Sequence, residues 1–254
     1  MIKQNTPPQH SELNSGSQSL DKILMNLVEQ LNQKNQSLEA LVNDPFNRLH
    51  SWDDCYSFFQ THWDDLSRCR SDSKVLNDAT LQFAYYFASF GMYRGNAYLQ
   101  CSKEIFKEPL RQVFRLIGQK HLTCDAVCQD PKIILEIDKT FKSALEKSIK
   151  QTGQEPAVSL LARQKFLLGV FAAVPAFDNQ FKKALSKERK THFLFKKLHP
   201  ELTERNVKSI CELQKALQEC QDFMCLEPKT IANKKFPVIR KLDLIFWLLG
   251  KKNS

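Results

Sequence analysis

Glycine is scarce in this chain, and that scarcity limits the possible folds more than any other feature of the sequence. Only 7 of the 254 residues are glycine, against a typical share of roughly 7%. β-Sandwiches, β-barrels and phosphate-binding loops need glycine at their turns. The patterns G-x-x-x-x-G-K-[ST], G-x-G-x-x-G and G-x-S-x-G are also missing. These observations exclude the familiar nucleotide-binding loops and nucleophile elbows, and they favour a helical fold.

Apolar residues recur at intervals of three and four along most of the chain, which is the spacing of one helix face. No unit of roughly 20 to 50 residues repeats, so a solenoid is not indicated. We therefore predict an all-α fold, in which residues 45–254 form one compact domain of eight or nine helices. The clearest helical segments are residues 51–69, 74–93, 109–118, 131–153, 156–171, 203–224 and 237–249.

The N-terminal part divides into two segments of different composition. Residues 1–18 combine Pro, Ser, Gln and Asn without apolar periodicity, which predicts a disordered leader. Residues 19–43 carry an apolar stripe at helical spacing until Asp44-Pro45, which predicts a long amphipathic N-terminal helix. Such a stripe can dock onto another protein, so a protein-interaction module is one alternative for the function. The stripe consists of Leu20, Ile23, Leu24, Leu27, Val28, Leu31, Leu38, Leu41 and Val42.

Hydropathy and cysteine content bear on the location of the chain. The longest apolar stretch, residues 166–177, contains 12 residues and a proline, whereas a membrane-spanning helix needs about 20. The N-terminus lacks the apolar segment of a secretory signal. The eight cysteines are spread over the chain rather than concentrated as in small disulfide-rich domains. We expect no membrane span, reduced thiols and a cytoplasmic location.

Charge is distributed unevenly between the two halves of the chain. Residues 1–127 hold 13 basic and 14 acidic side chains, whereas residues 128–254 hold 24 and 14, so the net charge of +9 comes entirely from the C-terminal half. Clustered positive charge attracts polyanions. It is equally typical of a solvated lysine-rich surface, and the sequence leaves both interpretations open.

Two basic clusters account for the excess, and both are candidate polyanion-binding sites. The first lies between residues 180 and 199 and contains one acidic residue, Glu188, whereas the second lies between residues 229 and 241 and contains none. Lysine contacts to phosphate give affinity without sequence preference. The candidate residues are Lys182, Lys183, Lys187, Arg189, Lys190, Lys196, Lys197, Lys234, Lys235, Arg240 and Lys241.

Arg94 follows an aromatic segment in which apolar residues cover nearly every helix face. A buried guanidinium needs a partner, because an unpaired charge inside a protein is costly. The sequence offers two partners for Arg94, a carboxylate such as Asp78 or an anionic ligand.

One group of residues has metal-like spacing, His121, Cys124 and Cys128. A structural zinc site needs four ligands in tetrahedral positions, and no fourth ligand lies nearby in the sequence. The alternative is a pair of ordinary thiols on a loop and a short helix. We expect neither a metal nor a cofactor.

Lys165 and Asp178 suggest a third functional class. Lys165 lies inside a strongly apolar helical segment, and Asp178 follows the turn Val174-Pro175-Ala176. This arrangement is similar to that of helix-hairpin-helix DNA glycosylases, all-helical enzymes in which an Asp just after a helix assists base excision and some members add a Lys. The similarity covers about 20 residues, and the Gly-rich hairpin of that family has no counterpart here. Alternatively, Asp178 caps a helix and Lys165 extends from an apolar face to solvent.

The helical pattern and the uneven charge together favour a non-catalytic helical protein that binds nucleic acid or another polyanion through its basic C-terminal half. Such a protein acts alone or as a subunit of a larger assembly. A protein-interaction module that docks through its N-terminal helix is the first alternative. A glycosylase-like DNA-processing enzyme centred on Lys165 and Asp178 is the second. No helix-turn-helix with a Gly turn, RNA-binding aromatic signature or zinc finger is visible.

Overall fold

The computed structural model describes residues 11–33, 50–68, 73–93, 98, 101–226 and 236–251. Over these ranges the chain forms thirteen α-helices and one 3-10 helix, without any β-strand. The predicted all-α fold is therefore confirmed for the described part of the chain. No helix within those ranges is long and apolar enough to cross a membrane.

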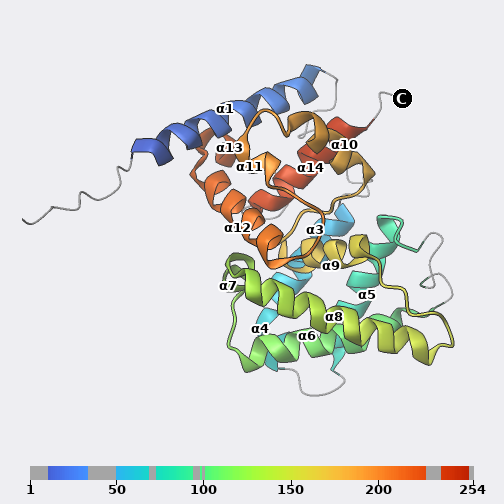
Figure 1. The fold of residues 1–254 in the computed structure, drawn as a ribbon. Coiled ribbons are helices and arrows are strands. Elements are labelled where there is room, and N and C mark those ends of the chain that lie inside the picture. Colours follow the sequence, from blue (N-terminus) through green and yellow to red (C-terminus); the bar gives the residue numbers. More distant parts are fainter. Residues whose placement is uncertain are drawn as a thin grey trace, which may run out of the picture.

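Figure 1 shows how these helices are arranged. The helices α4, α5, α6, α7 and α8 form the lower part of this view, and α1, α10, α11, α12, α13 and α14 form the upper part. The bounds are α1 Ser11–Gln33, α3 His50–Thr61, α4 Trp63–Arg68, α5 Lys74–Ser89, η2 Lys103–Phe106, α6 Lys107–Gln119, α7 Cys124–Gln129, α8 Pro131–Gln151, α9 Leu160–Phe171, α10 Asn179–Glu188, α11 Phe193–Lys196, α12 Glu204–Glu219, α13 Gln221–Cys225 and α14 Val238–Gly250.

The predicted number of eight or nine helices is wrong, because thirteen are present in the described ranges. The excess comes largely from short helices, since α4, α7, α11 and α13 have only four to six residues each. Helices this short complete fewer than two turns, so they show no 3.6-residue periodicity. The predicted helix over residues 51–69 also breaks at His62, which separates α3 from α4.

The predicted N-terminal helix over residues 19–43 is described only as far as Gln33, where α1 ends. Residues 34–43 and residues 1–10 of the predicted leader lie outside the described residues. Residues 11–18, which we assigned to the leader, belong to α1. The extent of the N-terminal helix beyond Gln33 therefore stays a prediction.

The apolar stripe of α1 packs against α12, α13 and α14. The carboxylate of Asp21 reinforces this contact, because it accepts hydrogen bonds from the backbone N–H of Asp222 at 3.1 Å and of Phe223 at 3.0 Å. These are orphan donors in the first turn of α13, so a residue of α1 caps a helix near the other end of the chain. The buried stripe residues are Leu20, Leu24, Leu27, Val28 and Leu31.

The core is centred on α9, which lies in the middle of the molecule in Figure 1. Every residue of α9 from Gln164 to Phe171 is buried, as expected for a helix that is apolar on all sides. The Trp52 indole donates a hydrogen bond to the Leu168 carbonyl at 3.0 Å, and the Tyr86 hydroxyl donates to the Lys165 carbonyl at 3.0 Å. These two bonds anchor α3 and α5 to α9.

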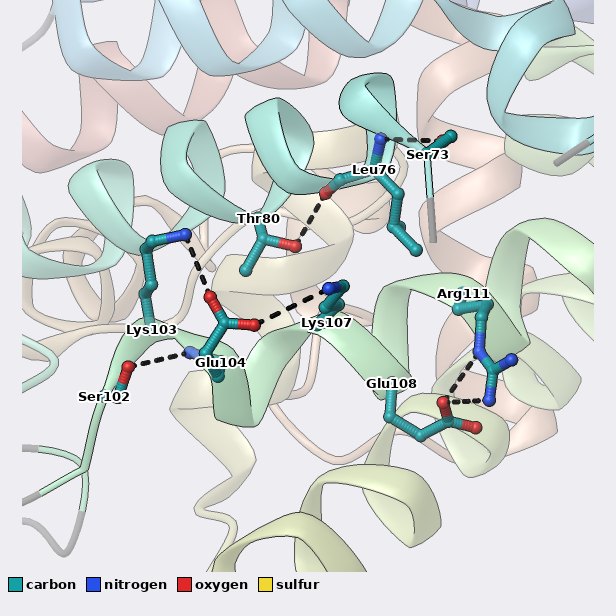
Figure 2. A network of polar contacts seen from close by, with 9 residues as sticks. All are labelled: Ser73, Leu76, Thr80, Ser102, Lys103, Glu104, Lys107, Glu108 and Arg111. Atoms are coloured by element: carbon teal, nitrogen blue, oxygen red, sulfur yellow. Dashed lines mark hydrogen bonds and ion pairs between the residues drawn. The ribbon is translucent and has the colours of Figure 1, made fainter. Parts of the chain in front are cut away.

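Polar side chains fix the N-terminal ends of several helices, as Figure 2 shows for α5 and η2. The Ser73 hydroxyl accepts a hydrogen bond from the Leu76 N–H at 3.2 Å, and the Ser102 hydroxyl accepts one from the Glu104 N–H at 3.3 Å. Both are N-cap bonds that satisfy donors without a partner inside their helix. The same figure shows the ion pair between Glu108 and Arg111 on α6.

Gly250 lets α14 approach α10 closely. A Cβ atom at this position would overlap the backbone carbonyl of Gln180, which lies in α10. The rings of Phe181 and Phe246, one from each helix, meet at a centroid distance of 5.1 Å. This packing fixes one face of α10 against the core and leaves the opposite face to solvent.

Candidate nucleic-acid interface and a buried charge cluster

The first basic cluster lies on the solvent side of α10 and on the turn after it. The inward face of α10 buries Phe181, Ala184 and Leu185. Lys182, Lys183 and Lys187 fall within an arc of about 140° on the other side, because each residue advances about 100° around the helix, and Lys190 follows in the turn after α10. All are exposed, as is Lys196 at the end of α11. We call Lys182, Lys183, Lys187, Lys190 and Lys196 the basic surface.

The basic surface has no acidic partner in the described part of the chain. None of its five lysines forms an ion pair there. The only acidic residue between positions 180 and 199 is Glu188, which is half-buried. Burial raises the pKa of Glu188, and Lys187 and a hydrogen bond with Thr191 oppose that effect. The positive charge of the surface is therefore not neutralised locally.

Two other residues of the predicted cluster already have protein partners. Arg189 donates a hydrogen bond from Nη2 to the Leu198 carbonyl at 2.9 Å, which ties the end of α10 to the segment after α11. Lys197 forms an ion pair with Glu212 of α12 at 3.2 Å. These contacts give both residues a structural role, although they lie beside the basic surface.

Phe193 is a feature of this region that sequence analysis missed. Its side chain is 54% exposed, and it lies on α11 between Lys190 and Lys196. The Lys197 Nζ lies 5.4 Å from the centre of its ring. Its exposure follows from α11, because that helix has only four residues and turns Leu194 and Phe195 inward instead. The signal that was available in the sequence is the pair of aromatic residues, Phe193 and Phe195, in a segment with lysines on both sides.

Arg240 and Lys241 lie inside the protein, away from the basic surface. They are 2% and 5% exposed. Lys241 donates hydrogen bonds from Nζ to the carbonyls of Phe223 at 3.3 Å and Met224 at 3.0 Å, at the end of α13. Counting charges along the sequence could not show this burial. The helix α14 is apolar on nearly every side, so it packs in the core and both cations are buried with it. Because both side chains are buried, we leave them out of the proposed interface.

Three predicted site residues lie outside the described residues. These are Lys234 and Lys235 of the second basic cluster and Arg94, the predicted buried cation. Their assignments stay predictions.

Lys165 and Asp178, the pair that resembled a glycosylase site, do meet in the structure. The Lys165 Nζ lies 3.7 Å from the Asp178 carboxylate. Asp178 is the N-cap of α10 and accepts hydrogen bonds from the N–H of Gln180 at 3.1 Å and Phe181 at 2.9 Å. The capping interpretation of Asp178 is thus confirmed. Contrary to the alternative interpretation, the side chain of Lys165 does not extend to solvent, because the residue is only 3% exposed.

A second buried ion pair lies beside the first. Asp243 of α14 accepts a hydrogen bond from Arg240 Nη1 at 2.7 Å and one from the Ala176 N–H at 2.8 Å. Lys165, Asp178, Asp243 and Arg240 together form what we call the buried charge cluster. It joins α9, the turn before α10, and α14.

Burial governs the electrostatics of this cluster. Burial raises the pKa of Asp243, and the charges of Lys165 and Arg240 act in the opposite direction. The Arg240 guanidinium lies 4.8 Å from the centre of the Trp52 ring, and its Nε has no hydrogen-bond partner in the described structure. Chemically, the cluster offers an amine, a guanidinium and two carboxylates. Lys165, Arg240 and Asp243 are buried, whereas Asp178 is half-buried.

The residues with metal-like spacing do not assemble into a metal site. Among the described residues, no group of three or more His, Cys, Asp or Glu side chains is placed to hold a metal ion. The Cys128 thiol donates a hydrogen bond to the Phe171 carbonyl at 3.0 Å. Its hydrogen bond with Cys124 and its burial raise the pKa of Cys128. Cys124 and Cys128 therefore fit the alternative of ordinary thiols, and His121 is exposed at the end of α6.

No family model, curated protein or solved structure matches this chain. The function must therefore be argued from the basic surface, Phe193 and the buried charge cluster themselves.

Proposed function

We propose that this chain is a non-catalytic protein that binds nucleic acid through the basic surface. The observation that carries the proposal is the group of five exposed lysines without an ion-pair partner in the described structure. Lysines in ion pairs must give up a partner before they bind phosphate, whereas unpaired lysines release only counterions. Lys234 and Lys235, which lie outside the described residues, belong to the same proposal as an extension of the surface.

Phe193 favours nucleic acid over a polymer that carries charge alone. Nucleic acid bases stack on exposed aromatic rings, and such stacking stabilises single-strand binding by about 1–3 kcal/mol per base. Bases within a duplex are already stacked on one another and are not available to a ring on the protein surface. An exposed ring in the same segment as the exposed Lys190 and Lys196 is therefore the combination expected for a single strand.

The two alternative functions find less support in the described contacts. The apolar stripe of α1 that was expected to dock onto another protein is covered by α12, α13 and α14. The Lys165 amine, which a glycosylase-like mechanism would need at the surface, is 3% exposed and paired with Asp178. The seven cysteines in the described residues are all free thiols. As part of the proposal we place the protein in the cytoplasm, where thiols stay reduced.

Binding of the wild-type chain to a labelled single strand of roughly 20 nucleotides tests this function. Fluorescence anisotropy over about 50 to 200 mM salt should give a logarithmic slope near −3, since each phosphate contact of a single strand contributes about −0.7 and the surface offers four or five lysines. The expected result is measurable binding at low salt that weakens steeply. Lack of binding at low salt would contradict the proposal.

Replacing Phe193 with Ala tests the role of the ring. We expect Phe193→Ala to weaken single-strand binding roughly tenfold, which corresponds to the loss of one stacked base. Binding to heparin should stay within about twofold, because heparin has no bases and contacts lysines through charge. Leu81→Ala is the matched control, since Leu81 is 53% exposed and lies on α5, away from the basic surface. Equal losses for the single strand and heparin would mean that Phe193 supports the surface without stacking.

A further inference from the structure

A separate open groove of about 940 Å³ lies between α4, α6 and α8. In Figure 1 these helices lie at the bottom of the molecule, and α10 and α11 lie in its upper part. The volume falls within the range of about 300–1,000 Å³ that is typical of small-molecule sites. The groove has therefore the size of a ligand site, and it is distinct from the basic surface.

Arginine dominates the charge of the groove. Among the described residues, three arginines and one carboxylate line it, which gives this part of the lining a net charge of +2 when His121 is neutral. Hydroxyl and amide side chains of Ser67, Gln112, Gln119 and Thr140 add hydrogen-bonding groups. The charged lining residues are Arg68, Arg111, Arg115 and Glu108.

Glu108 holds one side of the groove in place. Its Oε2 accepts a hydrogen bond from Arg111 Nε at 2.7 Å, and its Oε1 accepts one from Gln112 Nε2 at 2.7 Å. Figure 2 shows Arg111 and Glu108 facing each other along α6. One carboxylate thus orients two donors and reduces the entropy that they lose when a ligand binds.

Arg115 is the cation that is available for a ligand. It is exposed, and it forms no ion pair or hydrogen bond with its side chain in the described structure. It lies one helical turn from Arg111, so both side chains extend from the same side of α6. Arg68 lines the groove from the end of α4, and its ion pair within the described residues is with Asp64 at 3.5 Å.

The backbone beneath these side chains is closely packed. A Cβ atom at Gly118 of α6 would overlap the carbonyl oxygen of Ser67 in α4. The Trp63 indole, also in α4, donates a hydrogen bond to the Leu122 carbonyl just after α6 at 3.0 Å. These contacts fix the backbone of α4 relative to that of α6, and the three arginines extend from these two helices.

We propose that this groove binds the phosphate group of a small phosphorylated molecule, with Arg115 as the principal contact. Guanidinium groups bind phosphate oxygens through two parallel hydrogen bonds, and phosphate carries enough charge to engage more than one arginine. The amide and hydroxyl groups of the groove contact the rest of the ligand. This site does not depend on the nucleic-acid function, because it shares no residue with the basic surface.

Isothermal titration of the full chain with inorganic pyrophosphate and with ATP tests the proposal. Arg115→Ala should weaken binding about tenfold or more, as expected when a charged hydrogen bond is lost, and Arg115→Lys should restore part of it by keeping the charge. Lys150→Ala, at an exposed position of α8 outside both the groove lining and the basic surface, is the matched control and should leave the affinity unchanged. Circular dichroism of each variant checks that the fold is retained.

The possible outcomes separate this site from the basic surface. The proposal would be overturned if neither pyrophosphate nor ATP binds at millimolar concentration. It would also be overturned if Arg115→Ala and the wild type bind these probes with equal affinity. If Lys187→Ala, on the basic surface, loses binding and Arg115→Ala does not, the phosphate lies on α10 and the groove proposal is wrong. A further outcome is that binding of a nucleic acid single strand depends on Arg115 while neither pyrophosphate nor ATP binds. The groove would then contact the phosphates of a nucleic acid backbone, and the proposal of a small phosphorylated ligand would be overturned.

Discussion

Reversing Lys182, Lys183, Lys187 and Lys190 to Glu should abolish binding to single-stranded and duplex nucleic acid at about 0.15 M salt, close to physiological ionic strength. The variant loses four phosphate contacts and gains four carboxylates that repel the backbone. The salt slope should fall toward zero, because each lost duplex contact removes about 0.9 and each lost single-strand contact about 0.7. Anisotropy titrations at several salt concentrations measure both the affinity and the slope.

The fold should tolerate this reversal. All four side chains are exposed and lie outside the ion pairs of the described structure, and exposed substitutions usually change the free energy of unfolding by less than about 0.5 kcal/mol each. The end of α10 will lose somewhat more, because carboxylates at a helix C-terminus oppose the dipole. A cooperative thermal transition would show that lost binding does not reflect unfolding.

The chain offers a matched control for total charge. Lys132, Lys139, Lys147 and Lys150 are exposed on α8, and their reversal changes the net charge by the same amount at a different surface. This variant should retain most of the affinity, with a loss that comes from the long-range field alone. Equal losses in the two variants would show that net charge, rather than the basic surface, drives binding. Full binding by the α10 variant would place the contacts elsewhere, with Lys234 and Lys235 as the next candidates.

The helical class of the fold could be predicted from the sequence because the evidence for it is local. Glycine content, helical spacing and capping residues each act within a few residues, and they agree along the chain. Asp178 illustrates the point, because an acidic residue just before an amphipathic segment was sufficient to predict its N-cap role. The short helices could not be counted from the same pattern. Packing against neighbouring helices stabilises them, so tertiary contacts fix them rather than their own periodicity.

The candidate site, too, could be predicted from the sequence only in part. The lysines of α10 that the charge count selected are exposed, whereas Arg240 and Lys241, selected by the same count, lie in the core with α14. Charge at a residue predicts exposure only when the rest of the helix has a polar side, and α14 has almost none. The buried charge cluster joins residues more than 60 positions apart, as in the bond between Ala176 and Asp243. No spacing rule connects such residues, so only the structure could show that they meet.

The buried charge cluster leads to the largest expected effect on stability. Arg240→Met keeps most of the volume of the side chain but removes the partner of Asp243, whose carboxylate is 3% exposed. Removing one member of a buried ion pair typically costs about 3–5 kcal/mol, which is a large part of the 5–15 kcal/mol that stabilises a typical protein. Loss of the guanidinium above Trp52 adds to the effect. Urea unfolding at neutral pH should show a loss of about 3 kcal/mol or more.

The pH dependence of the stability loss in Arg240→Met shows whether the unpaired charge of Asp243 is its cause. Burial raises the pKa of Asp243 in the folded chain, and Arg240 opposes that rise, so removing Arg240 raises this pKa further. A carboxyl with a higher pKa in the folded state binds more protons there than in the unfolded state, and its contribution to stability therefore falls as the pH rises through that pKa. The loss caused by Arg240→Met should thus be largest at neutral to alkaline pH and should shrink as acid protonates Asp243.

Adding Asp243→Asn to the Arg240→Met variant supplies the control. The amide has no charge to bury, and its oxygen can still accept the hydrogen bond from the Ala176 N–H. The double variant should recover much of the lost stability at neutral pH and lose its dependence on the pKa of Asp243. If the loss in Arg240→Met is the same at acidic and neutral pH, and Asn at position 243 restores nothing, packing on Trp52 rather than charge pairing holds α14 in the core. Either result decides which force keeps a cation buried where the sequence alone would have placed it on the surface.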